Sequence, residues 1–145
     1  IYSKKDMRIK TLDPNMPDLK YHSEHAAAID LLAGEKTIIE PGQHTLIDTK
    51  VCFEIPNGHV GLIWDKSGVA NKRKLTLMGG VIDADYRGEI KVGLINIGLE
   101  TQTFEKYEKI AQILIQKVER VEIEMVEELN ETGRSDGGFG STGRF

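Results

Sequence analysis

The chain has 145 residues, of which 39% are hydrophobic and 29% are charged, so it is long enough to bury a core and we expect one soluble domain. Its formal net charge of -4 and its pI near 5.6 argue against stable binding to nucleic acid and against attraction to an anionic membrane, because both need a basic surface. The single cysteine, Cys52, excludes an internal disulfide and a cysteine metal cluster, and it fits a reducing compartment.

Neither a secretory signal nor an apolar run of the roughly 20 residues that a membrane span requires occurs in the sequence. We therefore expect a protein of the cytoplasm, or of the host-cell interior if the chain is viral, and not a secreted one. Met7 is a suitable native start, and residues 1–6 are expected to be an addition before it. The four histidines, including His22 and His25, lack the spacing of metal ligands, so no zinc held by the protein is expected.

Two segments in the first half of the chain carry local signals. Residues 26–33, AAAIDLLA, have mild helical propensity. Residues 52–64, CFEIPNGHVGLIW, place Pro56, Asn57 and Gly58 between two apolar runs. This arrangement predicts a β-hairpin, because Asn and Gly tolerate the positive φ angles of tight turns.

Residues 65–70, DKSGVA, place Lys66, Ser67 and Gly68 directly after the second of these apolar runs. If Ser67 caps a helical turn, the backbone N–H groups that follow form a small anion site beside the lysine. A capped turn with a solvated lysine is the alternative, and the segment by itself does not exclude it.

Residues 79–96, GGVIDADYRGEIKVGLIN, are the stretch of the chain richest in functional residue types. Gly79 and Gly80 permit a tight hairpin, and Asp83 and Asp85 share one face if the segment is extended. Paired carboxylates suit a general base or a metal ligand set. The alternative is that both aspartates cap a β-turn, which this residue type does often.

Alternation of apolar and polar residues dominates the second half of the chain. Ile90, Val92 and Leu94 lie on one side of a predicted strand, and residues 121–125, VEIEM, alternate in the same way and predict another. Gln112 interrupts a further apolar strand, at a position where a polar side chain usually faces solvent. Short strands joined by Gly and Pro turns predict an all-β subunit, a distorted jelly roll or β-barrel.

The composition changes after Asn130. Residues 131–145, ETGRSDGGFGSTGRF, contain five glycines, so we expect them to form a mobile tail on a β domain of residues 1–130. A disordered terminus is the ordinary explanation of such a composition. However, Arg134, unhindered N–H groups, one aromatic ring and two hydroxyls suit a polyphosphate and a stacked base. The G-x-G-x-x-G spacing in this tail fits neither a dinucleotide fold nor a P-loop, because no helix follows it.

Five segments, in order, resemble the five motifs of the trimeric deoxyuridine triphosphate nucleotidohydrolases, the dUTPases. The opening residues 7–17, MRIKTLDPNMP, also resemble a start common in that family, so the resemblance covers nearly the whole chain. The five segments are AAAIDLLA, DKSGVA, GGVIDADYRGEIKVGLIN, EKIAQILIQKV and RSDGGFGSTG.

This resemblance implies an assembly and a reaction. In the family, three jelly-roll subunits share three active sites, and the glycine-rich tail of one subunit closes over a site built by the other two. The enzymes hydrolyse dUTP to dUMP and pyrophosphate by attack of water on the α-phosphorus, which limits uracil in DNA and supplies dUMP for dTMP synthesis. Magnesium (Mg2+) is the implied cofactor, held mainly by the phosphates and water and not directly by the protein.

The resemblance also implies residue roles. Asp83 matches the base that orients and deprotonates the attacking water, and Asp30 matches a supporting acidic residue. Tyr86 matches the tyrosine that packs under the sugar and leaves no room for a 2′-hydroxyl. The remaining substrate-binding positions are Gly80, Val81, Ile82 and Phe139 at uracil, Lys91 near the same pocket, and Lys66, Ser67, Gly68, Gln112, Arg134, Gly140, Ser141 and Thr142, of which most match phosphate contacts.

The second motif departs from the family pattern. Asp65 and Lys66 stand where the family usually has Pro and Arg, and the bulky Trp64 precedes them. Lysine keeps the charge but loses the bidentate guanidinium, and the Asp65 carboxylate is unfavourable near a triphosphate unless it points away or pairs with Lys66 or Lys72.

Two alternatives to a dUTP pyrophosphatase stay open at this point. One is a non-catalytic relative that binds nucleotide or a partner protein, which the altered second motif makes conceivable. The other is an enzyme related to deoxycytidine triphosphate deaminases, although the deaminase-type Ser-Ser-x-Ala-Arg sequence is absent.

Overall fold

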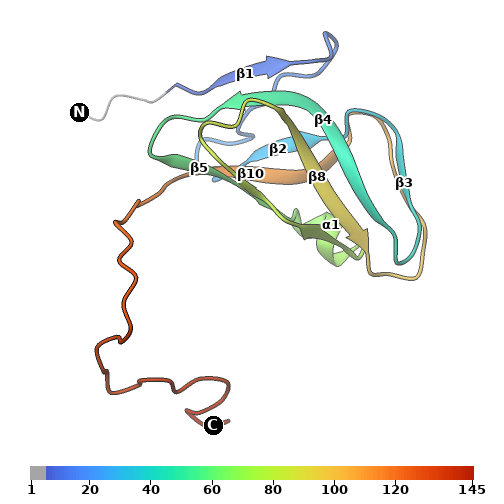
Figure 1. Ribbon diagram of the computed structural model, residues 1–145. Coiled ribbons are helices and arrows are strands. Elements are labelled where there is room, and N and C mark those ends of the chain that lie inside the picture. The colour runs from blue at the N-terminus through green and yellow to red at the C-terminus, as the bar shows by residue number, and fades with distance from the viewer. Residues whose placement is uncertain (1–5) are drawn as a thin grey trace.

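The computed structural model describes residues 6–145, and its regular elements are almost all β-strands (Figure 1). Within that range no helix is long and apolar enough to cross a membrane. The elements are β1 (Arg8–Thr11), β2 (Ile29–Leu32), β3 (Thr37–Ile39), β4 (His44–Glu54), β5 (His59–Trp64), α1 (Ser67–Asn71), β6 (Leu75–Met78), β7 (Val81–Ile82), β8 (Glu89–Asn96), β9 (Gln102–Phe104) and β10 (Lys109–Lys117).

The described residues form two four-stranded sheets and one two-stranded sheet. The strand orders are β1-β4-β8-β6 and β2-β10-β5-β7, and β3 pairs with β9. All pairs are antiparallel, and most neighbours in a sheet are distant in sequence. This connectivity confirms the predicted all-β fold with a distorted jelly-roll arrangement.

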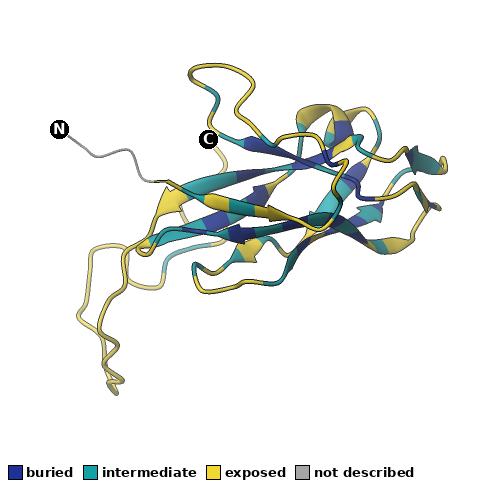
Figure 2. Ribbon diagram, turned by 90° about the horizontal axis from the view of Figure 1, so that it is seen from above, coloured by how far each residue is buried: buried dark blue, intermediate teal, exposed yellow. Residues whose placement is uncertain are grey.

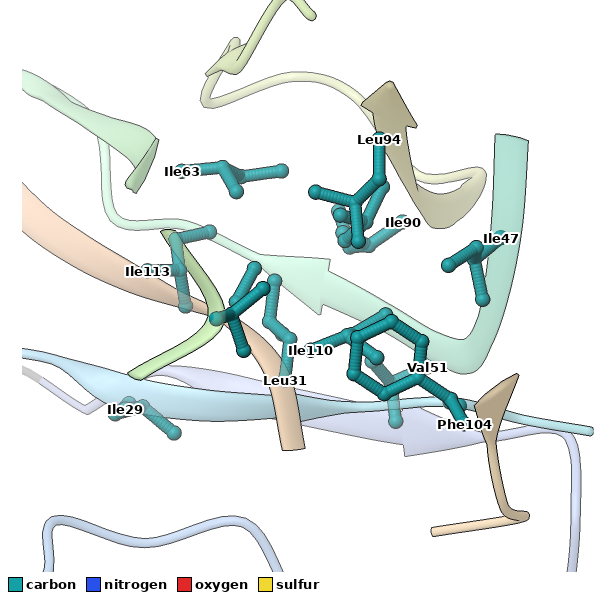
Figure 3. Close-up of a cluster of buried hydrophobic side chains, with 14 of the residues drawn as sticks. Ile29, Leu31, Ile47, Val51, Ile63, Ile90, Leu94, Phe104, Ile110 and Ile113 are labelled. Atoms are coloured by element: carbon teal, nitrogen blue, oxygen red, sulfur yellow. The ribbon is translucent and has the colours of Figure 1, made fainter. Parts of the chain in front are cut away.

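The core lies between the two large sheets, where the buried residues gather on the inner strand faces (Figure 2). Ile113 of β10 lies opposite Ile29 of β2 on one side and Ile63 of β5 on the other, and all three are buried (Figure 3). Each such side chain contributes roughly 1.5–3 kcal/mol on burial. From β8, Leu94 enters the same core, and its neighbours Ile90 and Val92 are also buried, as the alternation predicts.

Two local predictions in the first half of the chain are wrong. Residues 29–32 form strand β2 and not a helix, because Ile29 and Leu31 pack into the core and tertiary burial overrides a weak helical propensity. The turn at residues 56–58 exists, with Gly58 at φ 77°, but it does not close a hairpin. It joins β4 in one large sheet to β5 in the other.

The predicted strand at residues 121–125 is also absent. Strand β10 ends at Lys117, and residues 118–145 contain no strand or helix and run away from the sheets (Figure 1). Val121, Ile123 and Met125 are 77%, 82% and 91% exposed. The alternating pattern is real, but a strand also needs a hydrogen-bonding neighbour, and none of the described strands of this chain pairs with the segment.

Candidate active site

The glycine pair between β6 and β7 builds the first part of the site. Gly79 and Gly80 have φ angles of 85° and 137°, which few other residues adopt. The predicted tight hairpin is wrong, because β6 pairs with β8 in one large sheet and β7 pairs with β5 in the other, so the glycine pair connects the two sheets. The Gly80 carbonyl accepts a hydrogen bond from the Ile63 N–H at 2.8 Å, so this glycine connection is tied to β5. A β-carbon at position 80 would lie 2.9 Å from the Ile63 carbonyl oxygen. Only glycine therefore fits at this point of the connection.

Asp83 follows β7 and begins a turn. The Tyr86 N–H donates to the Asp83 carbonyl at 3.1 Å, so residues 83–86 are not extended, although Asp83 and Asp85 still line one common pocket. Both aspartates are exposed, and within residues 6–145 neither carboxylate caps the turn or forms an ion pair. The Asp83 carboxylate is therefore available to accept a proton from water.

A pocket of about 250 Å³ opens beside Asp83 and holds most of the residues predicted to contact the nucleoside. The Tyr86 hydroxyl donates to the Glu89 carbonyl at 3.0 Å, which fixes the tyrosine ring at the pocket wall. The Lys91 ammonium donates to the Asp48 carboxylate at 2.5 Å, and this bond raises the pKa of Lys91. The lining residues are Val81, Ile82, Asp83, Tyr86, Glu89 and Lys91.

The second part of the site lies on the outer face of the other large sheet. Gln112 of β10 is directly opposite Asp30 of β2 and Trp64 of β5, so the three side chains form one cross-strand row. The Gln112 amide donates to the Asp65 carbonyl at 2.8 Å. Gln112 is half-buried, and its hydrogen bond anchors the chain at the end of β5. The sequence alone predicted only that this polar side chain faces solvent.

The segment after this row carries the altered second motif. Lys66 holds the N-cap position of α1 with extended backbone and no side-chain capping bond, so Ser67 is the first helical residue and not the predicted cap. The Asp65 carboxylate accepts the Leu77 N–H at 3.1 Å. It therefore points back toward β6, away from the exposed Ser67 and Gly68, and it does not neutralise Lys66.

Asp30 is the centre of the charged groups in this row. The residue is 8% exposed. Its carboxylate pairs with the side chains of Lys66 at 2.5 Å, His22 at 2.9 Å and Lys109 at 3.2 Å. Burial opposes ionisation of the Asp30 carboxyl, but the hydrogen bonds from Lys66 and Lys109 outweigh it and hold its pKa below the ordinary value. The sequence prediction missed Lys109 and His22. The basic residue just before the Ile-Ala-Gln run was a usable signal for Lys109, whereas His22 lies in a loop without one.

The two parts of the site are well separated within one chain. Ile82 pairs with Gly61, and Asp83 follows it, whereas Lys66 lies five residues after Gly61 in the opposite direction. Gly61 and Trp64, three residues apart in β5, are about 10 Å apart at ~3.3 Å per residue, and Asp83 and Lys66 lie beyond the opposite ends of this stretch. A single chain therefore does not bring the predicted base and the predicted phosphate contacts around one small ligand.

The tail residues that were predicted to contact the substrate lie apart from both parts of the site. The tail folds into successive turns, in which the Arg134 guanidinium donates to the Gly137 carbonyl at 2.7 Å and the Ser141 N–H donates to the Gly138 carbonyl at 3.1 Å. Phe139 has a φ of 50° and is fully exposed. Gly140 and Thr142 share this exposed stretch, so the structure places none of these residues against the pockets of its own chain.

The oxygen-bearing side chains near the site suit a magnesium ion that is held mostly by the phosphates of a bound nucleotide. In the described part of the chain, no three His, Cys, Asp or Glu side chains are grouped so that they could hold a metal ion. Mg2+ commonly uses one or two carboxylates together with substrate phosphates and water. The exposed carboxylates of Asp83 and Asp85 are oxygen donors of that kind.

The sequence matches the family model described as dUTPase over residues 14–143. The chain belongs to the dUTPase family. It is 48% identical over 139 residues to the deoxyuridine 5'-triphosphate nucleotidohydrolase of Corynebacterium diphtheriae, covering 93% of this chain and 91% of that one. It is 41% identical over 139 residues to the enzyme of the same name from Anaeromyxobacter, covering 94% and 95%.

Solved dUTPase structures have the same fold. A mutant of the Staphylococcus bacteriophage 80alpha dUTPase with dUpNHpp superimposes with a TM-score of 0.87 at 27% identity, over 97% of this chain and all of that chain. A mutant dUTPase of the S. aureus phage phi11, which coordinates a structural Mg(II) ion, gives a TM-score of 0.79 at 25% identity, over 86% and 98%. The family and the all-β fold predicted from the five motifs are thus confirmed.

Proposed function

We propose that this dUTPase-family chain is a dUTP diphosphatase that hydrolyses dUTP to dUMP and pyrophosphate. The observation that carries the proposal is the unpaired carboxylate of Asp83 at the edge of the pocket that Val81 and Ile82 line, just after the glycine connection. Relatives that cover nearly the whole chain bear the name of this activity, which supports the assignment. The product dUMP then serves dTMP synthesis, and removal of dUTP limits uracil in DNA.

The chemical step requires a base and charge neutralisation. Asp83 accepts a proton from water as the water oxygen forms a bond to the α-phosphorus, and the bond from that phosphorus to the bridging oxygen breaks, so pyrophosphate leaves with the electron pair. A positioned carboxylate of this kind contributes about 10²- to 10⁴-fold to the rate. Lys66, Ser67, Gly68 and Gln112 contact the phosphates. Magnesium supplies charge neutralisation on the phosphates when it is bound.

Selectivity for uracil and for the deoxyribose comes from residues 80–82 and Tyr86. Gly80, Val81 and Ile82 present backbone groups to uracil, and a wrong base leaves buried polar groups unpaired, which costs about 1–3 kcal/mol for each group. Tyr86, fixed by its bond to the Glu89 carbonyl, lies under the sugar and excludes a 2′-hydroxyl. Lys91 closes the same pocket from β8.

Assembly into a homotrimer with shared sites completes this proposal. The separation of Asp83 from Lys66 within one chain supports it, because a second subunit can supply the missing half of each site. The unpaired residues 121–125 and the exposed Phe139 also suit contacts with neighbours. Arg134, Gly140, Ser141 and Thr142 then close over a neighbouring site. Sedimentation that found an active monomer would overturn the shared-site arrangement.

The proposed reaction is tested by pyrophosphate release. Purified protein with Mg2+ is mixed with dUTP, dCTP, dTTP or UTP, and Asp83→Asn is assayed beside the unchanged protein. We expect release from dUTP alone and a loss of at least 100-fold in the variant, since Asn cannot take the proton. Binding of dUTP without pyrophosphate release by the unchanged protein would favour the non-catalytic alternative.

A further inference from the structure

Strand β4 carries extra residues opposite one wall of the pocket beside Asp83. In the pairing of β4 with β8, Asp48 lies opposite Lys91, and Cys52 lies opposite Glu89. The three residues 49–51 of β4 therefore stand against a single residue of β8. This excess makes a β-bulge, the β4 bulge, and bulges are frequent beside active sites, where they redirect side chains.

The centre of the β4 bulge has a strained backbone. Lys50 has a φ of 59°, in the left-handed region that glycine adopts easily and a long side chain does not. Its carbonyl accepts the Leu12 N–H at 2.8 Å, and the Gly34 N–H donates to the Asp48 carbonyl at 2.7 Å. A β-carbon at position 34 would lie 2.6 Å from Cγ of Lys50, so the lysine stem packs over this glycine. Backbone strain persists where surrounding contacts fix it, and it is concentrated at functional sites.

The β4 bulge forms side-chain hydrogen bonds to β8 in place of regular ladder bonds. The hydroxyl of the buried Thr49 donates to the Ile90 carbonyl at 2.6 Å. The Lys50 N–H donates to the Glu89 carboxylate at 2.9 Å. A strand N–H ordinarily donates to a carbonyl of the neighbouring strand, and here the Glu89 side chain takes that place. The left-handed backbone of Lys50 therefore holds the Glu89 side chain against β4.

The same segment also holds Lys91. Asp48, the last residue before the bulge, accepts the Lys91 ammonium at 2.5 Å on one oxygen, and the Lys50 ammonium lies 3.6 Å from the other. The hydrogen bond from Lys91 holds the pKa of the Asp48 carboxyl below its ordinary value, so Asp48 stays ionised between the two lysines. Glu89 and Lys91 both line the pocket of about 250 Å³, and the Glu89 carbonyl accepts the Tyr86 hydroxyl at 3.0 Å. Three residues of the pocket wall thus depend on contacts at the bulge.

We propose that the β4 bulge, through the left-handed backbone of Lys50, positions Glu89 and Tyr86 and so determines how strongly the pocket prefers a deoxyribonucleotide to a ribonucleotide. This rests on the proposed function, in which Tyr86 excludes a 2′-hydroxyl. Lys50 does not line the pocket and is a positioning residue. When the bulge relaxes, Glu89 shifts, its carbonyl no longer fixes the Tyr86 hydroxyl, and the tyrosine ring leaves room at the sugar.

The ratio of affinities for non-hydrolysable dUTP and UTP analogues tests the proposal. It is measured by calorimetry with Mg2+ for the unchanged protein, Lys50→Val and Lys50→Gly. Valine strongly disfavours the left-handed region and glycine permits it, while both lack the ammonium group. We expect Lys50→Val to reduce the preference for the dUTP analogue about tenfold, the order of one hydrogen bond to a charged group. Lys50→Gly should change it less than about twofold.

Lys74→Val is the matched control. Lys74 has a φ of 58°, lies between α1 and β6, donates to the Asn71 carbonyl and does not line the pocket. Its replacement should lower the Tm, as Lys50→Val does, and leave the preference unchanged. An unchanged preference in Lys50→Val would make the bulge structural only, and an equal loss in Lys50→Gly would assign the effect to the ammonium group, so either result overturns the proposal. If thermal unfolding shows that Lys50→Val is not folded, Lys50→Ala replaces it, because alanine disfavours the left-handed region less than valine.

A double variant tests whether the bulge acts through Glu89. Glu89→Ala removes the carboxylate that accepts the Lys50 N–H. Because both changes break the same hydrogen bond, Lys50→Val combined with Glu89→Ala should reduce the preference no more than the larger of the single changes does. Losses that add would contradict the assigned route.

Failure of the proposed reaction is separable from failure of this inference. If the unchanged protein binds the dUTP analogue but does not hydrolyse dUTP, the reaction falls, whereas the ratio of analogue affinities still decides the role of the bulge. Equal affinities of the unchanged protein for the two analogues would overturn the proposed sugar selectivity and this inference together.

Discussion

Replacement of Gly80 by alanine perturbs the glycine connection between β6 and β7 at its most constrained point. At a φ of 137° an alanine costs about 1–3 kcal/mol of backbone strain. Its β-carbon would lie 2.9 Å from the Ile63 carbonyl oxygen, so the connection must shift or lose the hydrogen bond from the Ile63 N–H, a further ~0.5–1.5 kcal/mol. The combined cost is about 2–4 kcal/mol, divided between stability and binding.

Thermal unfolding and calorimetric binding of a non-hydrolysable dUTP analogue measure the two parts. If the connection stays in place, the Tm falls by roughly 6–16 °C, and if it moves, affinity for the nucleotide analogue falls by roughly 30- to 1,000-fold. Gly42→Ala is the matched control, because Gly42 has a φ of 76° with no heavy atom within 4 Å of the added carbon. The free-energy cost of Gly42→Ala therefore comes from backbone strain alone. Equal effects of the two substitutions on both measurements would refute the reasoning from the close contact.

Further changes test other parts of the account. Lys66→Arg should keep or improve affinity for the dUTP analogue in calorimetry, since a guanidinium matches phosphate oxygens, and a large loss would show that the loop has rearranged. Leu94→Ala removes a fully buried side chain and should cost about 2–5 kcal/mol in urea unfolding, whereas a loss below 1 kcal/mol would contradict the described core. The hydrogen bond from the Tyr107 hydroxyl lowers the pKa of Asp13 to about 2, so its contribution to stability is present above about pH 4 and lost as the pH falls toward 2. Tyr107→Phe should weaken this acid dependence in thermal unfolding, and an unchanged pH profile would count against it. Truncation after Glu131 should leave a folded protein by circular dichroism with little activity, and unfolding on truncation would contradict the separate tail.

The alternation of apolar and polar residues predicted the fold correctly in segments whose buried side chains follow that alternation. The alternation of Ile90, Val92 and Leu94 is the burial pattern of β8. The glycine pair has the positive φ angles that its backbone freedom suggests, but it connects the two large sheets and does not close a hairpin. The helical propensity of residues 26–33 gave a wrong prediction, because the packing of Ile29 against β10 decides the conformation of this segment. Turn chemistry at residues 56–58 specified a reversal of the chain but not which sheet the next strand would join.

The site was predictable in part, for a similar reason. The motifs point to Asp30 and Gln112 separately, but only the register of β2 with β10 shows that they face each other. The convergence of Lys66, His22 and Lys109 on one carboxylate joins segments far apart in sequence, and no spacing along the chain encodes it. The alternating pattern of residues 121–125 is present in the sequence, but none of the described strands of this chain pairs with the segment, so the pattern alone did not make a strand.

Hydrolysis of dUTP in water labelled with ¹⁸O tests the central claim most directly. We expect dUMP to carry the label and pyrophosphate to carry none, because water activated by Asp83 attacks the α-phosphorus. Label in pyrophosphate would place the attack on the β-phosphorus, and the absence of hydrolysis would contradict the proposed activity itself.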